Sequence, residues 1–203
     1  MSTRIGVFGG TFDPPHQAHL ILADEARHQL GLERVLWVLT PDPQHKEGQV
    51  ILPWQVRLEL LAAALDGDAA FEISRVEIER PRPHFAFETM RILREHYPEA
   101  ELIYLMGGDS LRDLPTWKRP LDFLTTCHAV GVMRRPGDAV DLTELERELP
   151  GLSEKVIFVA SPLLQISASE IRQRVVSGDP VRYYLPPRVY EIILDRGLYQ
   201  ATG

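Results

Sequence analysis

The chain has 203 residues, of which 44% are hydrophobic and 25% charged, and its formal net charge is −7 at pH 7. This is the composition of a globular protein large enough to bury a core. The acidic balance argues against a nucleic-acid-binding protein, so any anion site must be built locally from helix ends and a few basic side chains. No signal peptide and no apolar run long enough to span a bilayer is found, and we therefore expect a cytoplasmic protein without a membrane partner.

Apolar segments typical of strands alternate with helical segments along the chain, without repeats or a low-complexity linker. This alternation predicts an α/β fold with an open parallel sheet and helices on both faces. We expect a single domain over residues 1–203 that closes with a helical segment at 162–203. Strands are expected at 4–8, 34–39, 71–73, 101–106, 129–133 and 156–159, and helices at 18–30, 54–65, 88–96, 109–114, 142–149, 168–176 and 187–196.

The first strand is followed by Gly9 and Gly10, and His16 and His19 flank the start of the next helix. Because glycine lacks Cβ, a polyphosphate could approach the backbone here, and the helix would direct unpaired N–H groups and its positive dipole end toward it. Histidines at i and i+3 could reach the same anion, and if they are cationic, activity should fall on the alkaline side. A tight structural turn or a metal site would also fit the pattern, but no further metal ligand lies nearby.

The single cysteine, Cys127, cannot form an internal disulfide and lies in an apolar run at 127–133. We interpret it as an inert buried thiol, with a nucleophile as the weaker alternative.

A second polar cluster precedes the helix expected at 168–176. Ser167 and Glu170 form a capping box, which could serve helix stability alone. Ser169 and Arg172 add a hydroxyl and a guanidinium to the same helix start, where donors would converge on an anion. A purely structural helix would gain more from an acid than from an arginine in its first turn, so the pattern favours a second phosphate contact.

The segment at 9–14, followed by His16 and His19, resembles the N-terminal signature of the nucleotidylyltransferase superfamily, and specifically of the bacterial nicotinate-nucleotide adenylyltransferases. Residues 165–172 resemble the second signature of that family, a serine-rich turn that holds the ATP phosphates. The resemblance covers almost the whole chain. It implies a Rossmann-like fold and an enzyme of NAD biosynthesis that transfers the AMP part of ATP to nicotinate mononucleotide, with Mg²⁺ accompanying ATP.

The resemblance also assigns site residues, with the Trp117 indole stacked on the pyridine ring and Lys46 presented to phosphate. The expected catalytic residues are His16, His19 and Arg172. The expected ATP-binding residues are Gly9, Gly10, Thr11, Phe12, Gly108, Asp109, Ser167, Ser169 and Arg172. The expected acceptor-binding residues are Lys46, Phe85, Ala86, Thr89 and Trp117. No protein residue is expected to hold the metal, and the oligomeric state is left open.

The chain departs from the family pattern at several positions. Ala18 stands where a glycine usually precedes the second histidine, Gln44 replaces a proline, and Ser169 replaces a threonine. Ala86 lacks a hydroxyl that could face the nicotinate carboxylate, so only its backbone N–H remains for that contact. The choice between the acid and the amide acceptor therefore stays open. The two signatures are also compatible with a phosphopantetheine acceptor, with a cytidylyltransferase, and with a module that senses ATP without turnover.

Overall fold

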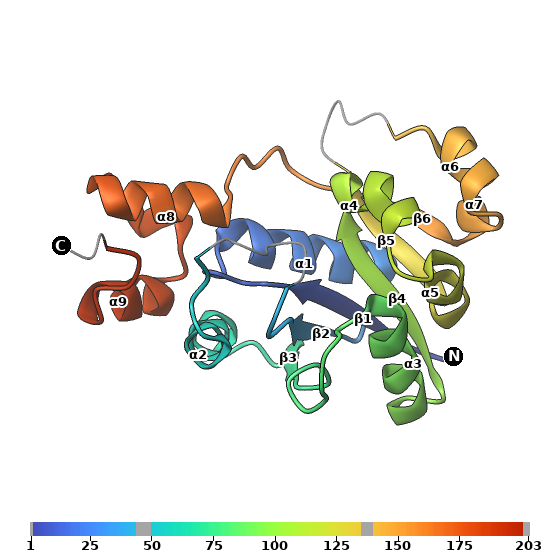
Figure 1. The fold of residues 1–203 in the computed structure, drawn as a ribbon, viewed down its shortest axis with the longest axis horizontal. Coiled ribbons are helices and arrows are strands. Elements are labelled where there is room, and N and C mark those ends of the chain that lie inside the picture. The colour runs from blue at the N-terminus through green and yellow to red at the C-terminus, as the bar shows by residue number, and fades with distance from the viewer. Residues whose placement is uncertain (1, 44–49, 135–139, 201–203) are drawn as a thin grey trace.

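The computed structural model describes residues 2–43, 50–134 and 140–200 (Figure 1). In these residues six parallel strands form one sheet in the order β3-β2-β1-β4-β5-β6. The order reverses between β1 and β4, because the chain leaves β1 toward one edge and returns to β4 on its other side. The strands are β1 (Thr3–Gly10), β2 (Arg34–Leu39), β3 (Phe71–Ser74), β4 (Ala100–Gly107), β5 (Ala129–Arg134) and β6 (Val156–Ala160).

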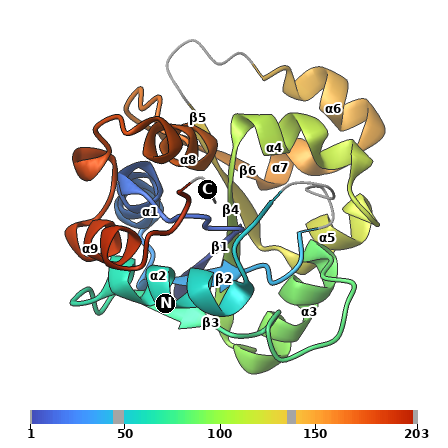
Figure 2. The same ribbon diagram turned by 60° about the vertical axis from the view of Figure 1, so that its left-hand side comes forward.

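Helices cover both faces of the sheet, as predicted (Figure 2). Strand residues alternate between the faces: Val35 and Trp37 belong to the cluster under the first helical layer, and Leu36 to the opposite cluster. The first layer contains α1 (Gln17–Leu30) and α2 (Trp54–Leu65). The second contains α3 (Ala86–His96), α4 (Gly108–Asp113), α5 (Pro120–Thr126), α6 (Leu142–Glu148) and α7 (Leu152–Lys155).

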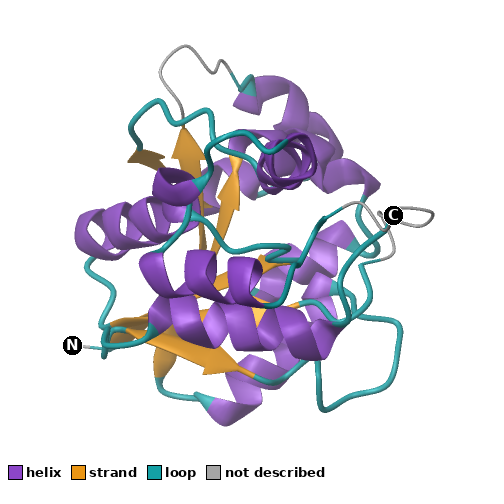
Figure 3. Cartoon of the chain, turned by 90° about the vertical axis from the view of Figure 1, so that its left-hand side faces the viewer, coloured by secondary structure: helices purple, strands orange, loops and turns teal. Residues whose placement is uncertain are grey.

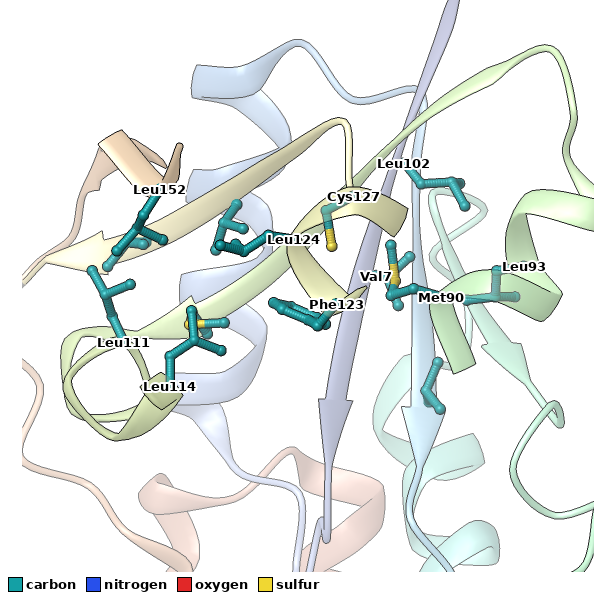
Figure 4. Packing of buried hydrophobic residues seen from close by; sticks show 14 of the residues in the cluster. Val7, Met90, Leu93, Leu102, Leu111, Leu114, Phe123, Leu124, Cys127 and Leu152 are labelled. Atoms are coloured by element: carbon teal, nitrogen blue, oxygen red, sulfur yellow. The ribbon is translucent and has the colours of Figure 1, made fainter. Parts of the chain in front are cut away.

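The core of the second layer is built on β1, β4 and β5. Figure 4 shows Phe123 and Cys127, at the end of α5, gathered with Val7 of β1 and Met90 of α3. Burial raises the pKa of the Cys127 thiol to about 12, so it is protonated and unreactive at neutral pH.

The C-terminal segment forms a third apolar cluster against α2. It contains α8 (Ala168–Ser177), the 3₁₀ turn η3 (Arg182–Tyr184) and α9 (Pro187–Asp195). Ile171, Val189 and Ile193 pack with Leu60 of α2. Figure 3 looks onto the side of the molecule where α8 and α9 lie. This packing brings the last helices next to the segment that follows β1.

Several boundaries differ from those predicted. β1 continues to Gly10, so both glycines belong to the strand, and α3 begins at Ala86 instead of residue 88. The short elements α5, α7, η2 (Leu114–Thr116) and η3 were not predicted. In the part of the chain that the structure describes, no helix is long and apolar enough to cross a membrane.

Candidate active site

A cavity of about 770 Å³ opens beyond the carboxyl ends of β1, β2 and β4. Its lining includes Gly9 and Gly10 from β1, Thr40 after β2, Gly107 at the end of β4, and Trp117. This is the point where the strand order reverses, the usual ligand position in an open parallel sheet. The sequence prediction that the glycine segment lies at such a site is confirmed.

The two glycines have a different local role from the one expected. A Cβ on Gly9 would lie 2.9 Å from the hydroxyl oxygen of Tyr104, and a Cβ on Gly10 would lie 2.8 Å from the ring of Phe12. The space that these residues leave is thus filled by the protein's own side chains. The glycines line the cavity, but their missing Cβ atoms make room for Tyr104 and Phe12 rather than for a phosphate.

Phe12, expected to contact ATP, is buried and supports the turn after β1. Its φ of 49° is in the left-handed region, which is uncommon for a bulky residue. Its ring packs at 5.3 Å from Trp37 and 5.2 Å from His19, measured between ring centroids. The Phe12 ring therefore packs against His19 and helps to position the turn that carries His16 and His19.

His16 and His19 lie together, as their spacing predicted. Their rings stack with centroids 3.6 Å apart, and the backbone N–H of His16 donates to Nδ1 of His19 at 3.1 Å. His16 is also the N-cap residue of α1. When His19 is neutral, its proton must therefore be on Nε2, because Nδ1 is an acceptor.

The charge state of His16 differs from the expectation of a cationic pair. Its side chain is buried, and desolvation lowers the pKa of His16 to about 4. This ring is therefore neutral at pH 7, and its titration cannot produce a loss of activity on the alkaline side. A neutral imidazole can still donate one hydrogen bond to an oxyanion.

Arg172 comes from α8 to the same turn. Its Nη1 donates to the backbone carbonyl of Asp13 at 2.7 Å and lies 3.9 Å from Asp13 Oδ2. Residues far apart in the chain, which the sequence assigned to one site, are thus brought together. At the start of α8, Ser167 accepts a hydrogen bond from the Glu170 N–H at 3.2 Å, and its hydroxyl oxygen is 3.2 Å from that of Ser169. The predicted N-cap at Ser167 is confirmed, but the capping box is not, because the Glu170 carboxylate accepts from Arg174 Nε at 3.1 Å. The hydroxyls of Ser167 and Ser169 are both exposed.

Arg57, which was not predicted to belong to the site, is only 1% exposed. Its guanidinium donates to four backbone carbonyls at 2.6–3.0 Å and so joins the loops after β1 and β2. Burial lowers the pKa of Arg57, and Asp13 partly offsets this effect. A signal was present, because Arg57 shares a helix face with Leu60 and Leu61 at i+3 and i+4, both fully buried. The acceptor carbonyls are those of Leu52, Thr11, Thr40 and Pro41.

Four of the expected acceptor residues, Phe85, Ala86, Thr89 and Trp117, line one end of the cavity, whereas His16, His19 and Arg172 are not among its lining residues. Phe85 is the N-cap residue of α3 and Ala86 its first residue, so the helix N-terminus lies at the cavity wall. Trp117 lines the cavity with its indole packed on Phe123, 5.4 Å between centroids, and on Tyr104 at 6.1 Å. This end therefore combines aromatic surface with the unpaired N–H groups of a helix start.

Thr89 reaches the cavity wall, but its hydroxyl is used within the protein. It donates to Glu77 Oε1 at 2.7 Å and accepts from Arg80 Nη2 at 2.9 Å. Burial raises the pKa of Glu77, and the hydrogen bond from Thr89 opposes that rise. Thr89 is thus placed to hold the start of α3 against Glu77 and Arg80, which the sequence analysis had not singled out.

Gly108 and Asp109, both expected to bind ATP, are not among the residues that line the cavity. Gly108 is buried inside α4, and the Asp109 side chain is 78% exposed and paired with Arg112. The neighbouring residues Gly107 and Ser110 line the cavity instead. Lys46 lies outside the described residues.

Comparison with known proteins agrees with this geometry. Residues 7–174 match the cytidylyltransferase-like family model. The chain is 44% identical over 200 residues to a probable nicotinate-nucleotide adenylyltransferase of Thermomicrobium roseum, covering 98% of this chain and 93% of the relative. It is 39% identical to a protein of the same name from a Roseiflexus species, covering 98% and 99% of the two chains.

A solved structure shares the fold. The nicotinic acid mononucleotide adenylyltransferase of Plasmodium falciparum, complexed with NaAD, superposes with a TM-score of 0.80 at 17% identity, over 97% of each chain. The match to a family model, the full-length relatives and the shared fold lead to one assignment. The chain belongs to the nicotinate-nucleotide adenylyltransferases, within the cytidylyltransferase-like family.

Proposed function

We propose that this protein transfers the AMP moiety of ATP to nicotinate mononucleotide, forming deamido-NAD and releasing pyrophosphate. The observation that carries the proposal is a single cavity with two chemically different ends. One end is lined by Gly9, Gly10 and Thr11, and the other by Phe85, Ala86 and Trp117. His16, His19 and Arg172 are not among the lining residues, but they meet on the turn that follows Thr11. A polyphosphate fits the first end and an aromatic, negatively charged acceptor the second.

The reaction needs no covalent enzyme intermediate, since the phosphate of the mononucleotide is itself the nucleophile. It attacks the α-phosphorus of ATP in line with the leaving pyrophosphate, so positioning and charge stabilisation supply most of the rate. His16 and His19 donate to the α-phosphoryl oxygens and the leaving group. Ser169 and Arg172 hold the β- and γ-phosphates at the start of α8, with Lys46 nearby.

The α3 N-terminus supports the nicotinate form of the acceptor. Ala86 has no side-chain donor, but the first-turn N–H groups of an 11-residue helix and its positive dipole end favour a carboxylate. Lys118 also lines the cavity and adds positive charge, as does Arg119, whose guanidinium is paired with Asp122. Nicotinamide mononucleotide lacks the carboxylate and would gain less from these groups.

Mg²⁺ enters as part of the substrate, bound to the phosphates of ATP. Among residues 2–43, 50–134 and 140–200, no group of three or more His, Cys, Asp or Glu side chains could hold a metal ion. The residues at the phosphate end are instead histidines, hydroxyls and an arginine, which bind phosphate oxygens directly. When bound, the ion screens the charge that builds up on the pyrophosphate.

Pyrophosphate release from Mg-ATP tests the proposed function. Parallel reactions contain nicotinate mononucleotide, nicotinamide mononucleotide, phosphopantetheine or no acceptor. We expect release with the nicotinate form alone. Comparable release with the amide would show that the α3 N-terminus does not select the carboxylate, and ATP binding without release in any reaction would contradict a transferase.

Trp117→Ala should raise the KM for the mononucleotide about tenfold or more, because stacking of a base on an aromatic ring contributes about 1–3 kcal/mol. The KM for ATP should stay within about twofold. Initial rates with each substrate varied in turn measure both values, and Trp117→Phe, which keeps an aromatic face, is the matched control. Equal damage to both KM values would mean that Trp117 serves only to pack against Tyr104 and Phe123.

A further inference from the structure

The C-terminal segment is hydrogen-bonded to the turn that follows β1. Tyr199, which follows α9, donates its hydroxyl to Asp13 Oδ1 at 2.7 Å across 186 positions of sequence. Arg172 of α8 donates to the carbonyl of the same aspartate, and Gln17 of α1 donates to the carbonyl of Leu185 at 3.3 Å. Asp13 is therefore the residue at which Tyr199 and Arg172 meet.

Asp13 is deeply buried and lies three residues before His16. Its side chain is 1% exposed, and its Oδ2 accepts no hydrogen bond from the residues that the structure describes. The positive charges of Arg57 and Arg172 face it. Because the Asp13 carbonyl holds Arg172, a shift of this residue would move both the guanidinium and the backbone that leads to His16.

Tyr199 combines this contact with an unusual backbone conformation. Its φ of 63° is in the left-handed region, which a non-glycine residue rarely adopts unless the surroundings impose it. Burial, followed by the nearby Asp13 carboxylate, raises the pKa of Tyr199, so the phenol stays protonated and remains a donor.

We propose that Tyr199 is a positioning residue for the ATP end of the site: its hydrogen bond to Asp13 fixes the turn on which Arg172, His16 and His19 converge. The proposal rests on the proposed function only in taking ATP as the nucleotide. Tyr199 contacts none of the residues that line the acceptor end of the cavity by a hydrogen bond that the structure describes. Its loss should therefore affect the two substrates unequally.

Tyr199→Phe removes the hydroxyl and keeps the ring. We expect about tenfold weaker ATP binding, because a turn that has lost this bond must be ordered when ATP binds. We also expect a lower kcat, with the KM for the mononucleotide unchanged. Calorimetric titration with ATP in the absence of acceptor measures the affinity, and initial rates measure the kinetic constants. Tyr183→Phe is the matched control, because Tyr183 lies in the same segment with 86% of its surface exposed; it should behave as the wild type.

A double-mutant cycle with Asp13→Asn ties the effect to the hydrogen bond. If Tyr199 acts through Asp13, the loss of ATP affinity in the double variant should be clearly smaller than the sum of the two single losses. Unchanged ATP affinity in Tyr199→Phe overturns the proposal. So does an equal loss for both substrates together with a lower Tm, which would indicate a structural role only. ATP affinity is measured without an acceptor, so the test of Tyr199 gives a result even if the protein does not transfer AMP to nicotinate mononucleotide.

Discussion

His19→Ala is expected to lower kcat at least about 100-fold. Removing one preorganised donor to a developing oxyanion typically costs two to three powers of ten. Nδ1 of His19 accepts from the backbone N–H of His16, which fixes the ring and leaves Nε2 as the protonated nitrogen of the neutral form. Steady-state rates at saturating ATP and mononucleotide measure the effect, and circular dichroism checks that the variant is folded.

His28→Ala is the matched control, because His28 lies in the last turn of the same helix and is exposed. It should leave kcat within about twofold of the wild type. If His19→Ala retains its kcat while folded, the catalytic assignment is wrong, and the histidine pair serves to order the start of α1. Some loss of stability in His19→Ala is expected in either case, since its ring packs against Phe8 and Phe12.

Arg57→Leu should lower the free energy of unfolding by about 3–5 kcal/mol. The guanidinium is buried and donates to four backbone carbonyls, which a leucine would leave without their donor. Two of them, those of Thr11 and Thr40, belong to the loops that border the cavity. Urea unfolding measures the change. Arg57→Lys keeps the charge but not the planar set of donors, so its loss should be intermediate.

Arg91→Leu makes the same replacement at an exposed site on α3, where Arg91 pairs with Glu95. It should change the free energy of unfolding by no more than about 0.5 kcal/mol. An equal effect of the two substitutions would mean that the loops after β1 and β2 do not depend on Arg57. If Arg57→Leu does not fold at all, the free energies of unfolding of the wild type, Arg57→Lys and Arg91→Leu can still be compared.

The fold was largely predictable because its signals are local. An apolar strand followed by an amphipathic helix appears in the sequence as a change of period, and all six strands were predicted within a few residues of their bounds. α5 and α7 were not predicted. Both gain their stability from packing, since Phe123 and Leu152 are fully buried in the core. Their existence depends on neighbours that are distant in the sequence.

The candidate site was predictable in its outline but not in how its side chains are used. The prediction that Phe12 contacts ATP followed from its place in the motif, whereas its ring is packed between Phe8, Trp37 and His19. Thr89 was placed at the acceptor, but its hydroxyl is bonded to Glu77. In both residues the direction of the side chain depends on partners outside the motif.

By itself the sequence determined the alternation of strands and helices, the segment with Gly9 to His19, the segment with Ser167 to Arg172, and the family of the chain. These features depend on residue type and spacing over a few positions. Only the tertiary structure decided that Arg57 joins two loops, that burial keeps His16 neutral, and that Tyr199 reaches Asp13. Each of these depends on desolvation or on a contact across the fold, and neither quantity is encoded in local spacing.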